Sequence, residues 1–539
     1  MNKNILKQQL TTKRLDHLGL PAGLCKRYRI AERIDELIPL SKDDRTKSTH
    51  GQRVVAMILN GLGFCKSPLY MTERFYLDKP VELLIGKGLK AKHFNDDALG
   101  RTLDALHKFG TTKLFCHIAF DLTKILNLLG TKLNLDTTSL ALYGQYDSDE
   151  WDNAPKPTYG HSKDHRPDLK QIVVSLISTG PAGIPVWFES HDGNSSDKTS
   201  FHETIKEFNS FTQSLRNSEN FLWVADSALY TEGKLQKSDI EWLTHPPATY
   251  KLVKQYVACP DNDYEWEQLN KEYQSTPVKG PEGEYWHLIL SGQRRKAALK
   301  TLERKIDKEY EVKSKAVNSL AKELFSCEKD AQSVIKSLVK QFKYHKLSEQ
   351  TVTAKMGHKG KGRPAAGTAK IILGYHLKTT LEKDSKAIEQ AKIPCGRFML
   401  ATNRGGMSAQ EILDTYKEQD KVERGFLFIK DKSFHCNRIY LNNPQRIDAL
   451  MMIMTMSLLI YNLGQYQFRE KLKAEDTTVP NQLGKPTQQP TLCWIFIMLR
   501  GISCAYIADE YVGVINIGES QAEIINLMNE EIIEIYDMK

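Results

Sequence analysis

Apolar residues recur every three or four positions in the first part of the chain, which is the spacing of one face of an α-helix. The pattern is clearest in "GQRVVAMILNGLG" and in "DDALGRTLDALHKFGTTKLFCHIAFDLTKIL". Asp96 or Asp97 is expected to cap the second stretch, and Gly110 is expected to divide it into two helices. Residues 1 to about 130 are therefore predicted to be helical. Helical packing is the favoured use of this region, and a DNA-binding helix-turn-helix is the alternative.

From residue 133 the pattern changes to the alternation of β-strands. In "LNLDTTSLALYG" the leucines alternate with Asn134, Asp136 and Thr138. The segments "KQIVVSLIS" and "GIPVWFES" follow, joined by "TGPAG", a loop of hairpin length. A helix beginning near Ser196 comes next, and then "FLWVADSALY", a buried strand that ends at Asp226. The order strand, strand, strand, helix, strand predicts a mixed α/β sheet.

A later stretch returns to this rhythm with the strand "GRFMLATN" and the helical segment "MSAQEILDTYKEQDKVERGFLFIK". Ser408 and Glu411 form a capping box, which predicts one helix of about 22 residues. Tyr416, Glu423 and Lys430 stand seven residues apart, so this helix would carry them in one stripe. Gln419 falls on the same stripe. A further helix, capped by Asn443, is apolar nearly all round and is predicted to be buried.

Residues 245 to 390 lack the strand and helix rhythm of the flanking segments. "QRRKAALKTLERKIDKEYEVKSKAVNSLAKELF" is predicted to form a charged, solvent-facing helix. Residues 350–381 contain no Asp or Glu. Contact with a phosphate backbone and simple solvation are equally favoured readings of this basic stretch. Its cations are Lys355, Lys359, Lys361, Arg363, Lys370 and Lys378, and the Gly-rich loop within it, "GHKGKGRP", carries the DNA-contact candidates Lys359, Lys361 and Arg363.

Composition limits the class of protein. The chain has 539 residues, so two or three domains are expected. Its formal net charge of +9 slightly favours polyanionic partners. Nine cysteines without a C-x-x-C pair make a disulfide framework or a zinc site unexpected. Neither "MNKNILKQQLTTKR" nor the apolar run 449–461 suits a signal peptide or a bilayer span of ~20 residues, so a cytoplasmic protein without membrane partners is expected.

Three acids are candidates for chemistry. Asp136 and Asp226 stand where the strand pattern is otherwise apolar or hydroxylic, and Glu423 lies on the helix after the last strand. Three converging carboxylates would repel one another, and a divalent cation would resolve that repulsion. Oxygen ligands suit Mg²⁺, with Mn²⁺ as its substitute, and two such ions can bracket a phosphodiester. The spacing in the sequence leaves open whether the acids meet, since each alone also suits a surface or capping position.

The segments "LNLDTTSLALYG", "FLWVADSALY" and "YKEQDKVERGFLFIK" together resemble the three signature regions of bacterial insertion-sequence DDE transposases. The branch is the one with a Tyr-x2-Arg-x3-Glu-x6-Lys motif on its last catalytic helix. "GHSKDHRPDLKQIVVSLI" and "HDGNSSDKTSF" also match, and the resemblance covers residues 20 to 465. It implies an RNase H-like core whose first and fourth strands are adjacent, so that Asp136, Asp226 and Glu423 form a metal-binding DDE triad. It also implies an insertion domain between Asp226 and Glu423.

The resemblance implies that Tyr416 and Lys430 hold the DNA end on either side of Glu423. Gln419 departs from the motif, because arginine is typical there, and an amide brings no charge and no bidentate fork to a phosphate. This substitution puts the family's detailed strand handling, including a hairpin intermediate, in doubt for this chain.

The resulting prediction is a transposase that binds, cuts and rejoins DNA at the ends of its insertion sequence, acting as a dimer on double-stranded DNA. The alternatives are a catalytically inactive DNA-binding descendant and a metal-dependent nuclease of the same fold. The domains predicted in chain order are a helical N-terminal domain open to DNA-end binding (1–130), the first part of the RNase H-like core (131–244), the insertion domain (245–390), the second part of the core (391–465) and a C-terminal region open to DNA or dimer contacts (466–539).

Overall fold

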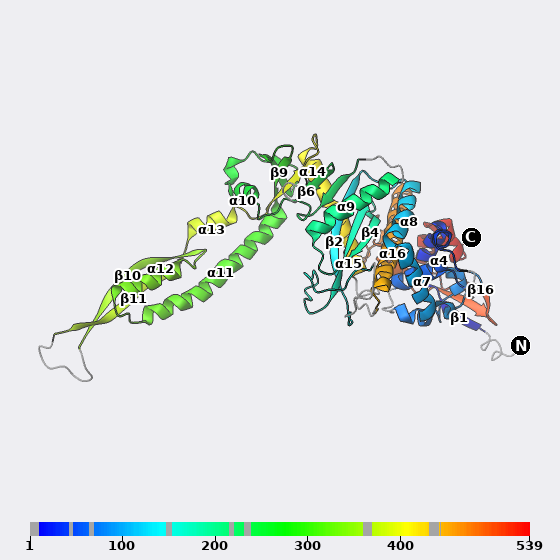
Figure 1. Cartoon of the computed structure of the whole chain (residues 1–539), viewed down its shortest axis with the longest axis horizontal. Helices are drawn as coiled ribbons and strands as arrows, with labels where there is room; N and C mark the ends of the chain where they lie inside the picture. Colours follow the sequence, from blue (N-terminus) through cyan, green and yellow to red (C-terminus); the bar gives the residue numbers. More distant parts are fainter. Residues whose placement is uncertain are drawn as a thin grey trace. The chain divides into compact units, whose positions relative to one another are not determined.

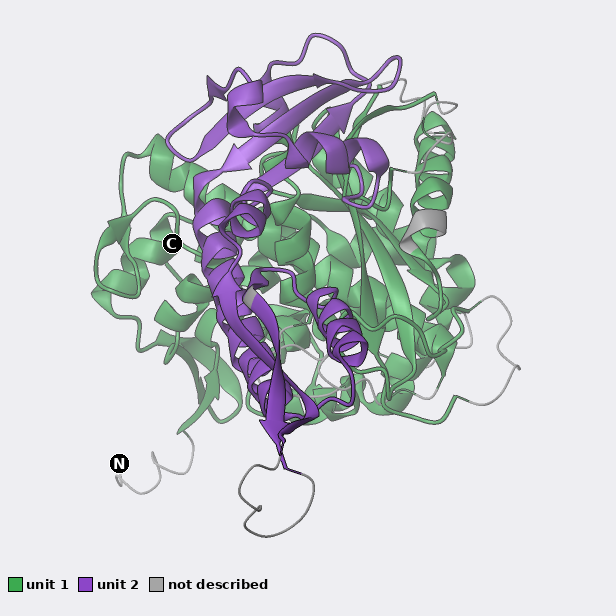
Figure 2. Cartoon of the chain, turned by 90° about the vertical axis from the view of Figure 1, so that its left-hand side faces the viewer, with its two compact units in different colours: residues 1–243, 414–539 green, residues 244–413 purple. Residues whose placement is uncertain are grey.

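The chain is seen here in a computed structural model (Figure 1). The structure describes residues 10–41, 47–63, 69–146, 154–214, 220–230, 235, 239–358, 369–430, 441 and 443–538. Two compact units are present, and they are coloured separately in Figure 2. Unit 1 comprises Met1–Leu243 and Asp414–Lys539, and unit 2 comprises Thr244–Leu413. Unit 1 is therefore discontinuous in sequence, and unit 2 is inserted into it.

The N-terminal part of unit 1 is mainly helical, as the apolar spacing predicts. Its helices are α2 (Gly19–Arg27), α3 (Ile30–Leu37), α4 (His50–Leu62), α5 (Thr72–Phe75), α6 (Val81–Leu84), α7 (Asp96–Phe109) and α8 (Thr111–Ile125). Gly110 separates α7 from α8. Its φ is 102°, a backbone conformation that residues other than glycine rarely adopt. The cap of α7 is Asn95, which accepts the Ala98 N–H, and not Asp96 or Asp97. Those aspartates lie in the first turn, where they complement the helix dipole.

One long apolar helix, α16 (Pro444–Ala474), forms the centre of this helical part. It packs against α2, α4, α7 and α8 and against strand β4 (Ile184–His191). Asn443 caps it and Pro444 occupies its first turn, as expected from the sequence. By length and composition α16 could cross a membrane, but 89% of its most apolar window is buried inside the protein. It is packed as a core helix.

The sheet of unit 1 has the strand order β4-β3-β2-β5-β6. Its other strands are β2 (Lys132–Ala141), β3 (Gln171–Thr179), β5 (Leu222–Ala225) and β6 (Glu241–Thr244). β2 pairs with β3 and β3 with β4 in antiparallel fashion, whereas β2 and β5 are parallel. Helix α9 (Asp197–Ser214) connects β4 to β5 and packs on β2, β3 and β4. The mixed α/β sheet and its adjacent first and fourth strands confirm the RNase H-like arrangement.

Aromatic side chains fasten the helices to this sheet. Phe208 of α9 makes edge-to-face contacts with Trp187 of β4 at 5.6 Å and Trp223 of β5 at 5.4 Å, measured between ring centroids. Phe120 of α8 meets Phe208 in the same way at 6.4 Å. Each such pair contributes about 0.5–1.5 kcal/mol beyond its buried area. Figure 1 shows α8 beside β4, where these aromatic contacts are made.

Two strands that lie far apart in the sequence pair in unit 1. Strand β1 (Leu10–Arg14) pairs antiparallel with β15 (Ser503–Ile507), which also pairs with β16 (Glu510–Ile515). The strand β1 departs from the helical prediction for this region, because its partner lies at the other end of the sequence. The remaining C-terminal helices are α17 (Leu492–Met498), α18 (Glu519–Asn526) and α19 (Glu530–Ile535), and α19 packs on α2.

Unit 2 contains an antiparallel sheet in the order β12-β9-β8-β7 and a separate hairpin of β10 and β11. The long helix α11 is largely exposed, as its charge pattern predicts. It shares a small apolar core with α12 and the hairpin, formed by Val317, Phe325, Ala331, Ile335, Leu338, Leu347 and Leu377. The elements are α10 (Lys251–Ala258), β7 (Glu267–Gln268), β8 (Tyr273–Lys279), β9 (Tyr285–Ser291), α11 (Gly292–Lys322), α12 (Glu328–Val339), β10 (His345–Gly357), β11 (Ile371–Lys383), α13 (Ser385–Lys392) and β12 (Arg397–Thr402).

Candidate active site

Two candidate acids lie at the same level on neighbouring strands of the sheet. The parallel register of β2 and β5 pairs Leu135 with Ala225, so the next residues, Asp136 and Asp226, follow at the same level. Asp136 is within β2, and Asp226 comes directly after β5. Both are part-buried. The fold therefore brings together two carboxylates that are far apart in sequence.

Each aspartate is held by a nearby backbone amide. The Thr137 N–H donates to Asp136 Oδ1 at 2.7 Å, and the Ala228 N–H donates to Asp226 Oδ1 at 2.8 Å. These two hydrogen bonds fix the orientation of each carboxylate. The two side chains are thus positioned as oxygen ligands for a cation.

The helix expected to carry the stripe is interrupted. It is divided into α14 (Ala409–Lys417), opened by the predicted Ser408–Glu411 capping box, and α15 (Asp420–Ile429). The prediction of one helix of about 22 residues is therefore wrong. At the junction the Gln419 N–H bonds to the carbonyl of Tyr416, only three residues back. Such a bond tightens the last turn of a helix and ends its regular ladder.

A lysine on β2 contacts the junction between α14 and α15. Lys132 Nζ donates to Thr415 Oγ1 at 2.9 Å and lies 3.7 Å from a carboxylate oxygen of Glu418. The other carboxylate oxygen of Glu418 is 3.6 Å from Lys421 Nζ. These contacts tie the helix junction to the strand that carries Asp136. Nothing in the sequence marks Lys132 for this role, because it stands at the start of a strand without a motif around it.

The third acid, Glu423, lies on α15, which packs beside β2 and β3. Its side chain is exposed and has no hydrogen-bond or ion-pair partner among the described residues. Within the described ranges, no group of three His, Cys, Asp or Glu side chains is gathered closely enough to hold a metal ion. Asp136 and Asp226 fit a hard divalent cation as two neighbouring oxygen ligands. Glu423 is on the adjacent helix but is not gathered with them in this conformation.

The other stripe residues have different environments. Gln419 is only 6% exposed, so its amide is not presented to solvent as a phosphate contact would require. Tyr416 is part-buried at the end of α14. Lys430, at the end of α15, forms an ion pair with Asp164, with 2.6 Å between Nζ and Oδ1. Because of the break between α14 and α15, these side chains do not form the continuous stripe that a single helix would carry.

Asp164 belongs to the segment before β3, which contacts the site on two sides. The neighbouring residue, Lys163, donates from Nζ to the carbonyl and the hydroxyl of Thr137, at 2.7 Å and 2.8 Å. Its backbone N–H donates to Ser139 Oγ at 2.8 Å. Lys163 therefore contacts the strand carrying Asp136, and Asp164 contacts the helix carrying Glu423. The segment is one of those that carry the family resemblance, and its adjacent Lys163 and Asp164 were the signal in the sequence for its role.

The basic loop residues Lys359, Lys361 and Arg363 lie outside the described residues. The rest of the acid-free stretch forms the facing parts of β10 and β11. Lys355, Lys370 and Lys378 are exposed there. Their exposure makes them accessible to a phosphate backbone, and the contact itself stays a prediction.

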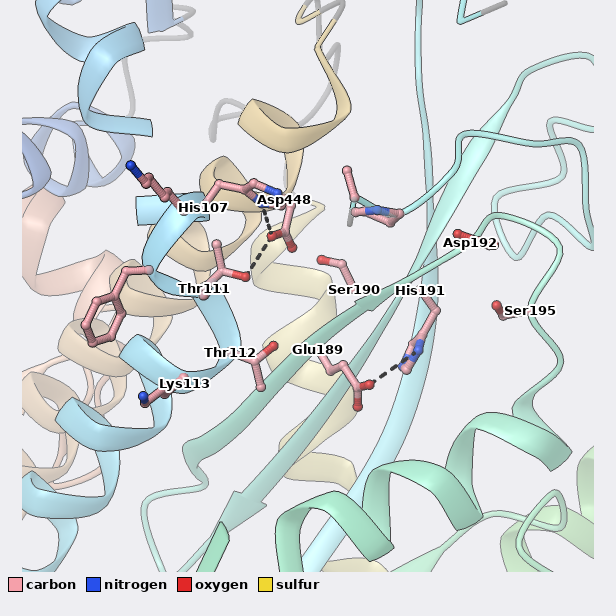
Figure 3. Close-up of a pocket in the computed structure, with 15 residues that line it drawn as sticks. His107, Thr111, Thr112, Lys113, Glu189, Ser190, His191, Asp192, Ser195 and Asp448 are labelled. Atoms are coloured by element: carbon pink, nitrogen blue, oxygen red, sulfur yellow. Dashed lines mark hydrogen bonds and ion pairs between the residues drawn. The ribbon is translucent and has the colours of Figure 1, made fainter. Parts of the chain in front are cut away.

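A cavity of about 670 Å³ lies at the junction of α7 and α8 and beside the end of β4 (Figure 3). Asp448 accepts hydrogen bonds there from His107 at 3.0 Å and from Thr111 at 2.7 Å. Glu189 lies 3.7 Å from His191, and burial raises the pKa of the Glu189 carboxyl. None of the three candidate acids lines this cavity. It is a separate feature of unit 1, with mixed charge.

Comparisons with known proteins address the identity of the chain. Residues 10–120 match a domain of unknown function, DUF4277, and residues 131–463 match a transposase DDE domain. No curated protein matches. A solved structure, the cryo-EM structure of piggyBac transposase synaptic complex with hairpin DNA, is similar with a TM-score of 0.39 and 9% identity, covering 91% of this chain and 82% of that one.

The transposase domain model spans more than half of the chain. It includes both strands with the aspartates and the helix with Glu423. The paired acids on β2 and directly after β5 are thus part of a recognised domain, and the chain belongs to the family of transposases with a DDE domain.

Proposed function

We propose that the protein cleaves DNA at the ends of its own insertion sequence and joins the freed strand to target DNA, with Asp136, Asp226 and Glu423 holding Mg²⁺ or Mn²⁺. The observation that carries the proposal is the parallel pairing of β2 with β5, which places Asp136 level with Asp226. The packing of α15 beside β2 supports Glu423 as the third ligand.

When bound, two divalent ions would activate the attacking oxygen and stabilise the leaving oxygen of a phosphodiester. The aspartates would supply ligands from a rigid sheet, oriented by the Thr137 and Ala228 amides. Glu423 would close the set from α15. Lys430 and Tyr416 would hold phosphates of the DNA end, and Lys163 would keep β2 in place beside the reacting strand.

The working complex would be a dimer on double-stranded DNA, because joining both ends of an element requires both ends in one assembly. The protein would act in the bacterial cytoplasm, on the nucleoid. The insertion, unit 2, would add backbone contacts through its basic hairpin. Inverted repeats and a short direct duplication in the DNA flanking the gene would support the assignment.

A metal-dependent nuclease of the same fold is the second candidate, because the same acids would serve hydrolysis without joining. The two are separated by incubating the protein with its own genomic segment, flanks included, and a supercoiled target plasmid in Mg²⁺. Joined products support the transposase. Cleavage that never gives a joined product supports the nuclease.

The acids themselves are tested by Asp136→Asn, Asp226→Asn and Glu423→Gln, which are expected to abolish cleavage while leaving DNA binding and the melting temperature nearly unchanged. Asp420→Asn is the matched control, because it removes a carboxylate from the same helix, one turn from Glu423. A Glu423→Gln protein that cleaves at the normal rate in Mg²⁺ would contradict the triad. Isothermal titration of Mn²⁺ into the same variants provides a readout independent of cleavage.

A further inference from the structure

A cleft of about 380 Å³ lies in unit 1 along one flank of α15, between that helix, α16 and the turn joining β3 to β4. Four cations line it: Lys421 and Arg424 from α15, and Arg469 and Lys473 from α16. One carboxylate, Glu470, also lines it. The lining therefore carries an excess of three positive charges (four cations minus one carboxylate).

Arg469 is the most informative of these cations because it is half-buried without a carboxylate. Its Nε donates to the Pro490 carbonyl at 2.8 Å and its Nη2 to the Gln489 carbonyl at 3.4 Å. Among the described residues it forms no ion pair. Burial lowers the pKa of the Arg469 guanidinium, and the nearby Arg424 lowers it further. Desolvated like charges of this kind are normally compensated by an anion.

Two of the other three cations, Arg424 and Lys421, are only weakly neutralised. Arg424 is exposed, and its Nη2 is 3.7 Å from Asp420, too far for a hydrogen bond. Lys421 is 3.6 Å from Glu418 and donates to the Gly180 carbonyl at 3.4 Å. Only Lys473 has a close partner, Glu470, at 2.6 Å. Arg424 and Arg469 together thus present donors that suit the two oxygens of a phosphate.

The apolar part of the cleft also suits a nucleic-acid strand. Phe428 and Tyr461 are in contact, with ring centroids 4.5 Å apart, and both line the cleft. Tyr461 is held by its hydroxyl, which accepts the Cys493 N–H at 3.1 Å. Grooves that bind DNA strands combine cations for the phosphates with aromatic side chains for sugars and bases.

We infer that this cleft, centred on Arg424 and Arg469, binds a phosphodiester of the DNA strand that runs past Glu423. The inference rests on the proposed function, because Arg424 directly follows Glu423 on α15 and the two side chains therefore point about 100° apart around one helix. The contact is to the backbone and is independent of base sequence.

The test measures DNA affinity of the full-length protein as a function of salt, with EDTA present so that no cleavage occurs. Arg424→Gln is the main variant, because its exposed side chain makes misfolding a minor concern. It is expected to weaken binding of a duplex of arbitrary sequence about tenfold. The slope of log affinity against log salt should fall by about one. Arg469→Gln should have the same effect. Because Arg469 is half-buried, the melting temperature of this variant is measured to verify that it is folded.

Lys471→Gln is the matched control. It removes a lysine from the same helix, but Lys471 is paired with Glu475 and does not line the cleft. Its affinity and salt slope are expected to equal those of the unaltered protein. If Arg424→Gln and a folded Arg469→Gln behave like Lys471→Gln, the inference is overturned.

Two further measurements distinguish which DNA is bound and which proposal fails. Weaker binding of the linear genomic segment carrying the element ends assigns the cleft to the end, whereas weaker capture of supercoiled target alone assigns it to the target. Binding is measured without metal, so it remains informative if Glu423→Gln still cleaves and the triad is refuted. Unchanged binding in the cleft variants, with cleavage lost in Glu423→Gln, refutes the cleft alone.

Discussion

The ion pair between Lys430 and Asp164 gives the sharpest prediction for the candidate site. Lys430 Nζ lies 2.6 Å from Asp164 Oδ1, and the two side chains are 20% and 34% exposed. If Lys430 holds a DNA phosphate, Asp164 occupies that lysine in the DNA-free protein and must be displaced on binding. Lys430→Ala and Asp164→Ala are therefore expected to change DNA affinity in opposite directions.

The magnitudes follow from the partial exposure of the pair. A pair this accessible contributes no more than about 1 kcal/mol to the free energy of unfolding. Either variant should therefore lower the melting temperature by no more than about 3 °C. In the DNA-free protein Asp164 competes with the phosphate for Lys430, and this competition costs DNA binding up to the same free energy. The Asp164→Ala variant should therefore bind DNA up to about fivefold more tightly. Removing Lys430 deletes a charged hydrogen bond to phosphate, so DNA should bind at least about tenfold more weakly.

The assay is fluorescence anisotropy with duplex DNA at one fixed salt concentration, with thermal unfolding measured on the same samples. Asp168→Ala is the control, because Asp168 lies in the same segment but pairs with Arg166. If the ion pair is purely structural, both variants will lose the same small stability and neither will alter DNA affinity. Weaker binding in Asp164→Ala would also refute the reasoning.

Three more predictions follow. Gln419→Arg should destabilise the protein by several kcal/mol, because Gln419 is 6% exposed and the new charge would be buried; urea unfolding checks this, and a variant of unchanged stability would show that the position opens to solvent. Burial lowers the pKa of His17 from 6.5 to about 4, so the unfolded chain binds the proton more readily. The free energy of unfolding therefore keeps its full value above pH 6.5 and falls by up to about 3 kcal/mol as the pH is lowered toward 4. The His17→Phe variant should lose less stability than the unaltered protein between pH 7 and pH 5, as measured by urea unfolding at both pH values. An equal loss in the two proteins would contradict this. The basic loop residues Lys359, Lys361 and Arg363 are replaced by Ala in the last test. The slope of log DNA affinity against log salt should then fall by roughly one per phosphate contact, and an unchanged slope would mean that the loop is only solvated.

Local chemistry made much of the secondary structure predictable. The alternation around Asp136 and the apolar run before Asp226 predicted β2 and β5, and both are present. Gly110 ends α7, and the Ser408–Glu411 box opens α14, because these features depend on residues a few positions apart. Pairing of β2 with β5 followed from the family resemblance and not from the spacing, since no local rule specifies which strands are neighbours.

The tertiary structure decided the arrangement of the helix with Glu423. Tyr416, Glu423 and Lys430 have helical spacing in the sequence, but the helix is divided between Lys417 and Asp420. The junction is contacted by Lys132 from β2, and Lys430 is paired with Asp164 from another segment. Helical periodicity contains no information about such long-range partners, because they depend on which strands and loops pack against the helix.

The same reason explains the N-terminal strand and the basic cleft. β1 exists because β15, from the other end of the sequence, supplies its hydrogen bonds. Arg424 and Arg469 lie on α15 and α16, and the sequence does not show that these two helices pack against each other. The sequence by itself determined α7, α8, α16, β2 and β5, and it placed the two aspartates within or directly after a strand, through propensity, capping and alternation. Packing decided which charges meet, because burial and electrostatic contact depend on distances in space and not on separation along the chain.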